Sequence, residues 1–410
     1  MKRDKYVISG FIICAALALA VLFSACSSDG QAQAPSSLSS ATEAPTEPPT
    51  QDPVTKQLGG MSTDEKIGQL VVSGFEGYDV DETFASLITE SHIGGAILFS
   101  RNIRDAQQLC GLINEIKETA GSGIPLLIGM DEEGGAVTRL PDGVLSMPGA
   151  YALAQKGDPE TCYNGAMQIA DQLKSFGLST GFCPDLDIWS NPDNTVIGDR
   201  AYGTDAQSVV KYGIAAMKGV RDGGVVPVVK HFPGHGDTDT DSHYSLPVIT
   251  KTKEELMEQE LIPFQEAVKQ NVPAVMVGHL QCTQLDEKYP ASLSYKIVQG
   301  LLRDELGFDG VAFTDDLTMG AIAENYSLGN ACVLAVNAGC DMLLICHEYE
   351  NVDKALTALK KAVGSGKITM DRLDEAVTRI LRLKADYNIT SETVEMPDVA
   401  ALNARTQEFY

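Results

Sequence analysis

The feature that most constrains the fold is a series of eight short apolar runs, separated from one another by longer amphipathic or charged stretches. The runs are QLVVSGF from Gln69, GGAILF from Gly94, PLLIGM from Pro125, GFCPDLDI from Gly181, VVPVVKHF from Val225, AVMVGHL from Ala274, GVAFTDDL from Gly310 and DMLLIC from Asp341. Their hydrophobicity is continuous rather than alternating, which indicates strands covered on both faces of a parallel sheet. The stretches between them have helical character, for example residues 205–221, 251–270 and 370–383. We therefore predict an α/β fold, a (β/α)8 TIM-type barrel forming a single catalytic domain.

A doubly wound open sheet would give the same alternation, so the positions of polar residues are needed to separate the two folds. Ionisable residues end several different runs, among them Asp131, Asp187, Lys230, His279 and Asp315. A barrel gathers the carboxyl ends of all its strands around one central site, whereas an open sheet leaves most of them apart. No GxGxxG or GxxxxGK[ST] sequence follows the first run, so a nucleotide-binding fold has little support.

The N-terminal residues have the pattern of an export signal. The basic sequence MKRDK precedes an apolar stretch from Tyr6 to Phe23, and Ser24-Ala25 lead directly to Cys26. This order predicts a signal peptide over residues 1–25, and small residues followed by Cys resemble a bacterial lipoprotein cleavage box in which Cys26 becomes lipidated. An uncleaved membrane-spanning helix is the alternative, because roughly 17–25 apolar residues cross a bilayer. In either case we expect the rest of the chain on the outer face of the cell membrane.

Composition divides the remainder of the chain into three segments. Residues 26–54 join the predicted lipid-attachment Cys to a Ser/Thr/Pro-rich stretch that has too few large apolar residues to fold, which indicates a disordered linker. Residues 55–395 have the length of one α/β barrel. Residues 396–410 are expected to form a C-terminal tail.

Charge and cysteine content exclude some classes of protein. The formal net charge of −25 argues against nucleic acid as a partner, because a polyanion needs clustered Lys and Arg. Beyond Cys14 and Cys26, seven cysteines are scattered without a CxxC pair: Cys110, Cys162, Cys183, Cys282, Cys332, Cys340 and Cys346. An odd number, mostly within apolar strings, predicts buried core thiols rather than a disulfide framework or a zinc site.

The densest group of chemically active residues lies in KHFPGHGDTDTDSHYSLP, which begins at Lys230. Thirteen residues of it hold three of the six histidines together with three aspartates: His231, His235, Asp237, Asp239, Asp241 and His243. A calcium loop fits poorly, because Ser242 replaces its glycine and Val248 stands in place of its bidentate Glu. A His/Asp zinc site remains open as a metal-binding alternative.

The same segment also allows an acid/base pair. Residues two apart on an extended loop point to the same side, so Asp241 can accept a hydrogen bond from one ring nitrogen of His243. The carboxylate favours the imidazolium form and makes His243 a proton donor near neutral pH. Acid/base chemistry of this kind also needs a group, such as a nucleophile, on the opposite side of the bond that breaks. Asp315, directly after the seventh run, is the best candidate, and we expect Asp316 to cap or brace the same loop.

Five segments in the same order resemble glycoside hydrolase family 3, in particular its NagZ-like β-N-acetylglucosaminidase branch. They are DEEGGAVTRL from Asp131, NPDNTVIGDRAYGTD from Asn191, KHFPGHGDTDTDSH from Lys230, VMVGHL from Val275 and FTDDLTMGAI from Phe313. The D-x-H pair distinguishes this branch from the β-glucosidase branch. The resemblance covers nearly all of residues 55–390.

This resemblance implies a retaining exo-β-N-acetylglucosaminidase in which Asp315 forms a covalent glycosyl-enzyme. His243 would act as the acid/base, supported by Asp241. The resemblance further implies a pocket for the non-reducing sugar made by Asp131, Arg139, Arg200, Lys230 and His231. For Arg139 a structural ion pair is the alternative. We expect a monomer without cofactor or metal that removes N-acetylglucosamine from glycans or cell-wall muropeptides and is held at the membrane by its lipid anchor.

Several alternatives remain open from the sequence. One is a family 3 glycosidase of β-glucosidase-like specificity, or a phosphorolytic variant that transfers the sugar to phosphate. Another is a sugar-binding lipoprotein with two lobes and no activity. A third is a metal-dependent barrel hydrolase.

Overall fold

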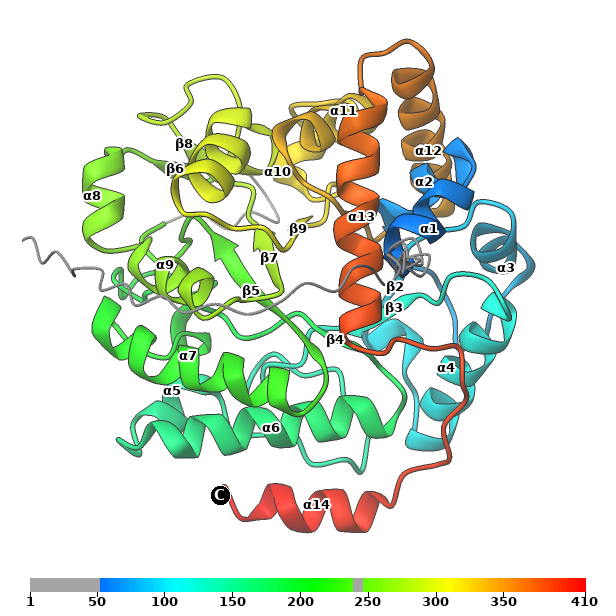
Figure 1. Cartoon of the computed structure of the whole chain (residues 1–410). Helices are drawn as coiled ribbons and strands as arrows, with labels where there is room; N and C mark the ends of the chain where they lie inside the picture. Colours follow the sequence, from blue (N-terminus) through cyan, green and yellow to red (C-terminus); the bar gives the residue numbers. More distant parts are fainter. Residues whose placement is uncertain (1–51, 239–245) are drawn as a thin grey trace, which may run out of the picture. The chain divides into compact units, whose positions relative to one another are not determined.

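The computed structural model describes residues 52–238 and 246–410 (Figure 1). The predicted signal peptide, the predicted lipidation site Cys26 and the predicted pair Asp241 and His243 lie outside the described residues. In the described part of the chain, no helix is long and apolar enough to cross a membrane.

Eight parallel strands form one sheet in the order β10-β1-β2-β3-β4-β5-β7-β9. The bridge between Phe313 and Met342, with a hydrogen bond of 2.9 Å from Thr314 N to Met342 O, joins β9 to the start of β10 and closes the sheet. The predicted barrel is confirmed, and each of the eight apolar runs contains or adjoins one of its strands. The strands are β1 (Val71–Ser73), β2 (Gly95–Leu98), β3 (Leu127–Met130), β4 (Thr180–Gly181), β5 (Val226–Phe232), β7 (Ala274–Val277), β9 (Val311–Thr314) and β10 (Leu343–Ile345).

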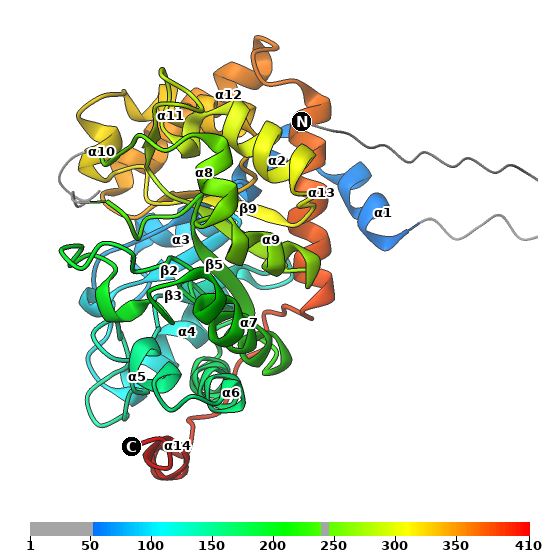
Figure 2. The same ribbon diagram turned by 90° about the vertical axis from the view of Figure 1, so that its left-hand side faces the viewer.

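Helices surround these strands, as the two perpendicular views show (Figures 1 and 2). They are α1 (Pro53–Gly60), α2 (Thr63–Gln69), α3 (Glu82–Thr89), α4 (Ala106–Ala120), α5 (Ala150–Ala154), α6 (Pro159–Ser175), α7 (Ala206–Asp222), α8 (Lys253–Glu258), α9 (Ile262–Lys269), α10 (Gly320–Ala323), α11 (Leu328–Ala338), α12 (Tyr349–Gly364), α13 (Met370–Asp386) and α14 (Val399–Gln407). A π-helix spans Lys296–Glu305.

Helix boundaries follow local capping chemistry. Asp205 begins α7 by accepting a hydrogen bond from Ser208 N, and Thr369 begins α13 in the same way with Arg372 N. The stretch 251–270 is divided into two helices, because Pro263 lacks a backbone N–H and is favoured in the first turn of a new helix. The helical prediction therefore holds for all three stretches, with one break.

The strands are buried on both faces, as their continuous hydrophobicity predicts. All residues of β1, β2, β3, β5, β7, β9 and β10 are buried. The seven cysteines outside the N-terminal segment are all buried and free, which confirms their prediction as core thiols. The barrel interior is thus a packed apolar layer that leaves polar groups to the strand ends.

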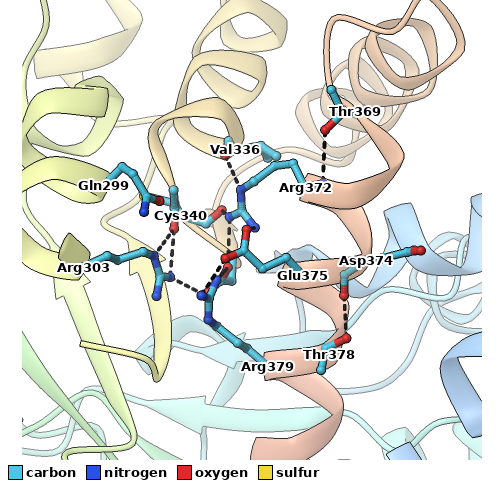
Figure 3. Close-up of polar contacts among 12 residues, drawn as sticks. Gln299, Arg303, Val336, Cys340, Thr369, Arg372, Asp374, Glu375, Thr378 and Arg379 are labelled. Atoms are coloured by element: carbon cyan, nitrogen blue, oxygen red, sulfur yellow. Dashed lines mark hydrogen bonds and ion pairs between the residues drawn. The ribbon is translucent and has the colours of Figure 1, made fainter. Parts of the chain in front are cut away.

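The amino ends of β9 and β10 hold a buried ion cluster around Asp341. Its Oδ2 accepts from Arg303 Nη2 at 2.6 Å and from Ala312 N at 3.0 Å, and its Oδ1 accepts from Arg372 Nη2 at 2.9 Å. Arg379 Nη1 lies 3.5 Å from the same Oδ1. Figure 3 shows the three arginines converging from the π-helix and from α13. This cluster joins two helices to the base of the barrel.

The last residues of the chain include a helix that packs on the barrel domain. Helix α14 lies beside α6 in both views (Figures 1 and 2). The Thr406 hydroxyl accepts hydrogen bonds of 3.1 Å from Gln168 Nε2 and from Gln172 Nε2, and Leu402 is buried. The stretch predicted as a tail therefore contains an ordered, docked element.

Candidate active site

A cavity of about 430 Å³ opens at the carboxyl ends of the barrel strands. This volume lies within the range of about 300–1,000 Å³ that is usual for small-ligand pockets. The six predicted site residues that the structure describes all line it: Asp131, Arg139, Arg200, Lys230, His231 and Asp315. They come from the ends of β3, β5 and β9 and from the loops after β3 and β4, so the barrel brings together residues that are far apart in the sequence.

Lys230 is the buried cation at the centre of the cavity wall. Its Nζ lies 2.6 Å from Asp131 Oδ1 and 2.6 Å from Glu133 Oε1, and its side chain is only 2% exposed. Burial disfavours the charged ammonium, but attraction by Asp131 and Glu133 outweighs burial and raises the pKa of Lys230. Lys230 is therefore a permanent cation that orients two carboxylates.

Glu133 forms the second ion pair of the cavity, and the sequence analysis did not single it out. Arg200 binds it in a bidentate manner, with Nε to Oε2 and Nη2 to Oε1 both at 2.9 Å. Burial favours the neutral acid, but Arg200 and Lys230 outweigh burial and hold the pKa of Glu133 well below its usual range. Its place two residues after Asp131, at the end of a buried strand, was the available signal.

Asp187 holds two histidines of the segment that begins at Lys230. Its Oδ2 lies 2.7 Å from His231 Nδ1, and its Oδ1 accepts from His235 N at 2.6 Å. Since a carboxylate can only accept, His231 Nδ1 carries the proton and Nε2 is left to accept a hydrogen bond. Burial, together with Arg200 and Lys230, lowers the pKa of His231 to about 4, so its ring is neutral at pH 7.

Asp315 follows β9 and is partly exposed within the cavity. Its Oδ1 accepts from Asp316 N at 2.8 Å. Removal from bulk water alone would raise the pKa of Asp315, but the electrostatic influence of His279, His231 and Lys230 and this hydrogen bond outweigh it and lower the pKa. The carboxylate is ionised, as a nucleophile must be.

Asp316 braces the loop after β9, as expected. Its Oδ1 accepts from Thr318 N at 2.9 Å and from Cys346 N at 3.1 Å, and its Oδ2 accepts from the Thr318 hydroxyl at 2.6 Å. His279 is fully buried away from the cavity, bonded through Nδ1 to Ser292 Oγ at 2.7 Å. Arg139 lines the cavity, and its Nη1 donates to Thr138 O at 3.0 Å.

Two glycines shape the start of the segment that leads to the predicted acid/base pair. A Cβ on Gly236 would lie 1.8 Å from Ile188 O, and a Cβ on Gly234, which has φ +131°, would lie 2.8 Å from Glu260 Cβ. Beyond them, Lys251 Nζ lies 2.8 Å from Asp237 Oδ2 and 2.5 Å from Glu260 Oε1. The ion pairs tie together the two ends of the segment that contains Asp241 and His243.

Some of the buried carboxylates near the cavity are close enough together to be considered as ligands of a metal ion. Ligand atoms of Asp185, Asp187 and His231 lie within 4.8 Å of one another. However, Asp187 is already hydrogen-bonded to the His231 ring, and Arg200 Nη2 lies 3.5 Å from Asp185 Oδ2. The Arg200 guanidinium therefore supplies positive charge beside Asp185, at the point where a cation would otherwise do so.

The chain is similar to one family over most of its length. Residues 62–383 match the family model described as the glycosyl hydrolase family 3 N terminal domain.

Individual relatives extend this similarity. Beta-hexosaminidase LpqI of Mycobacterium tuberculosis is 36% identical over 385 residues, which cover 91% of this chain and 96% of that protein. Beta-hexosaminidase A of Pseudoalteromonas piscicida is 34% identical over 355 residues, which cover 78% of this chain but only 59% of that protein. A solved glycoside hydrolase family 3 β-N-acetylglucosaminidase from Paenibacillus sp. str. FPU-7 matches with a TM-score of 0.80 at 42% identity, covering 85% of this chain and 69% of that one.

Proposed function

The chain belongs to glycosyl hydrolase family 3, and from this premise we propose that it is a retaining exo-β-N-acetylglucosaminidase that removes terminal β-linked N-acetylglucosamine. The observation that carries the proposal is the convergence of Asp131, Lys230, Arg200 and Asp315 on one cavity. The names of the relatives, beta-hexosaminidase and β-N-acetylglucosaminidase, support the choice of sugar.

The ion pairs of the cavity suit the recognition of a terminal sugar. Asp131 presents a carboxylate oxygen that is fixed by Lys230 at 2.6 Å, and Arg200 is fixed by Glu133. Charged groups held in this way form directional hydrogen bonds with hydroxyl groups and pay little entropy on binding. His231 adds a neutral ring whose Nε2 accepts a hydrogen bond from a sugar hydroxyl. We assign this side of the cavity to the non-reducing end of the sugar.

The reaction then proceeds in two displacements. The Asp315 carboxylate attacks the anomeric carbon, the glycosidic C–O bond breaks, and the departing oxygen takes a proton from His243. Water next gives a proton to His243 and attacks the anomeric carbon, which releases Asp315 and the sugar with its configuration retained. In this proposal Asp241 orients the His243 ring and stabilises its charged form.

We also propose that the enzyme acts outside the cell on muropeptides, anchored to the outer face of the membrane through lipidated Cys26. The support is the order of basic residues, apolar stretch and Cys in the N-terminal sequence. Wild-type protein from cells grown with labelled palmitate should carry the label, and Cys26→Ala should not. An unlabelled wild-type protein that stays in the membrane fraction would instead favour the uncleaved helix.

The test of the activity compares two sugars on the same aryl leaving group. We expect release of 4-nitrophenol from the β-N-acetylglucosaminide to exceed release from the β-glucoside by at least about 100-fold, because the acetamido group alone distinguishes the substrates. Equal rates, or a preference for the glucoside, would contradict the proposed specificity. The activity should survive exhaustive chelation, and loss on chelation would support the metal-dependent alternative.

A further inference from the structure

One wall of the cavity is not used by the groups assigned to the non-reducing sugar. It is formed by Phe99, which follows β2, and by His347, which follows β10. Their rings stack with centroids 5.8 Å apart and planes inclined by 29°. The His347 side chain is 53% exposed, so its ring forms the open side of this stacked pair. We call this pair the Phe99–His347 wall.

The barrel places this wall on the side toward which the leaving group must point. In the closed strand order, β4 lies opposite β10 and β3 lies opposite β9. Asp131 and Arg200 follow β3 and β4, whereas Asp315 and His347 follow β9 and β10. A sugar held at its non-reducing end by the first two residues and attacked at its anomeric carbon by Asp315 therefore extends its leaving group toward the loop that carries His347.

Hydrogen bonds to the N–H and to the C=O of Cys346, the residue before His347, fix the position of His347. Cys346 N donates to Asp316 Oδ1 at 3.1 Å, and Cys346 O accepts from Arg101 Nη2 at 2.5 Å. The Arg101 guanidinium also lies 4.5 Å from the centre of the Phe99 ring. The two rings are thus anchored to the nucleophile loop and to each other before any ligand binds.

The backbone next to His347 is strained in a way that fits a binding role. Glu348 has φ +63° and ψ 120°, a conformation that a non-glycine residue rarely adopts. Strain of this kind persists where the surrounding structure enforces it, and it is concentrated at functional sites. Here the effect is to turn the chain sharply after His347, so that its ring is presented to the cavity while Tyr349 begins α12.

From this geometry we propose that the sugar on the leaving-group side stacks on the Phe99–His347 wall, and that His347 sets the preference for a sugar over a minimal leaving group. This inference rests on the proposed function, and it adds the contacts made by the sugar on the leaving-group side of the glycosidic bond. Stacked flat rings suit the C–H face of a pyranose, as ligand pockets combine aromatic surfaces with a few polar groups. His347 Nε2 lies 3.7 Å from Asp316 Oδ2, so the other ring nitrogen, Nδ1, is the one assigned to contact a sugar hydroxyl.

The test compares a large and a minimal leaving group on the same enzyme. The substrates are the β-1,4-linked disaccharide of N-acetylglucosamine and N-acetylglucosaminyl β-fluoride, whose fluoride cannot reach the wall. For His347→Ala we expect kcat/KM to fall roughly tenfold for the disaccharide and to change less than about twofold for the fluoride. His347→Phe, which keeps a flat ring, should restore the disaccharide to within about threefold. Tyr295→Ala, at an aromatic residue that is 62% exposed outside the cavity, is the matched control.

The outcomes distinguish failure of the proposed subsite from failure of the proposed function. An equal fall for both substrates, or no change for either, would overturn the subsite, since the wall would then act on the reacting sugar or on nothing. Phe99→Leu provides a second variant, and it should lower the disaccharide-to-fluoride ratio without lowering fluoride hydrolysis. A wild-type protein that hydrolyses neither substrate would overturn the proposed function together with the subsite, whereas normal fluoride hydrolysis with unchanged ratios would overturn the subsite alone.

Discussion

Two buried charge clusters lie at opposite ends of the same barrel. At the amino ends of β9 and β10, one carboxylate, Asp341, is contacted by three arginines. At the carboxyl ends of the strands, the carboxylates outnumber the cations: Asp131, Glu133, Asp185, Asp187 and Asp315 surround Lys230 and Arg200. The first cluster is closed off by helices, whereas the second opens into the cavity.

The difference shows which cluster serves the fold and which serves the ligand. Both oxygens of Asp341 are hydrogen-bonded, so removing it would leave buried cations without a partner. At the other end Asp185 Oδ2 is buried without a hydrogen-bond partner among the described residues, and burial and Asp187 raise the pKa of Asp185 to about 7. An incompletely satisfied cluster is costly in free energy, which is typical of a site arranged for binding rather than for stability.

The largest expected effect is on catalysis at the carboxyl end. Asp315→Asn keeps the size of the side chain but removes the attacking charge, so kcat/KM for the 4-nitrophenyl N-acetylglucosaminide should fall by about 10⁴-fold or more. Steady-state kinetics measures this loss, and Asp353→Asn, at an exposed carboxylate on α12, should leave the rate unchanged. A rate within tenfold of wild type would remove Asp315 from the role of nucleophile.

The matching change at the amino end should act on stability instead. Asp341→Asn leaves Arg303 and Arg372 without their buried countercharge, which should lower the free energy of unfolding by about 3–5 kcal/mol. Urea denaturation followed by circular dichroism measures this change. The folded fraction should keep wild-type kcat. A variant of unchanged stability, or one that is stable but inactive, would contradict the assignment of the Asp341 cluster to stability rather than to catalysis.

A smaller catalytic effect is expected when the orientation of His231 is disturbed. Asp187→Asn replaces an acceptor by an amide that can donate to Nδ1, so the neutral ring would carry its proton on Nε2. We expect KM to rise and kcat/KM to fall roughly 100-fold, since misplacement of a binding group has effects of this size. Nitrogen NMR of the His231 ring reads the tautomer directly. Asp193→Asn, on the exposed loop after β4, serves as control, and an unchanged tautomer in Asp187→Asn would refute this account.

The smallest expected effect concerns Lys384, a buried residue at the amino end of the barrel, and the pH dependence of stability. Lys384 is buried there with Gln69 Oε1, at 2.7 Å, as its hydrogen-bond acceptor, and burial lowers its pKa to about 7 from 10.5. Since the unfolded chain then binds the extra proton between pH 7 and 10.5, wild-type stability should rise with pH across this window. Lys384→Met should flatten the rise by on the order of 2 kcal/mol between pH 7 and pH 9. Identical pH profiles for the two proteins would show that Lys384 is charged and solvated.

The sequence predicts the parts of the molecule that depend on local pattern. The eight strands follow from continuous apolar runs, and Asp131, Lys230 and Asp315 could be placed in one site because each ends such a run. Strand β4 is the least clearly predicted of the eight, since only Thr180 and Gly181 pair with both neighbouring strands. Its run is interrupted by polar residues that belong to the charge cluster.

Other features depend on contacts that no local pattern contains. Glu133 has a local signal in its place two residues after Asp131, but its ion pair with Arg200, 67 residues further on, has none. The Phe99–His347 wall was missed because its two rings come from the ends of β2 and β10, which become close only when the barrel closes. The docking of α14 likewise rests on Gln168 and Gln172, more than 200 residues earlier in the chain.

Peptide mass spectrometry of a trapped intermediate tests the central claim most directly. A 5-fluoro N-acetylglucosaminyl fluoride should form the glycosyl-enzyme and slow its hydrolysis, because the added fluorine destabilises the positively charged transition states. We predict one added sugar on the peptide that contains Asp315, and none in Asp315→Asn. A label on another carboxylate, or turnover of the compound by Asp315→Asn, would contradict the assignment of this cavity as a retaining glycosidase site with Asp315 as nucleophile.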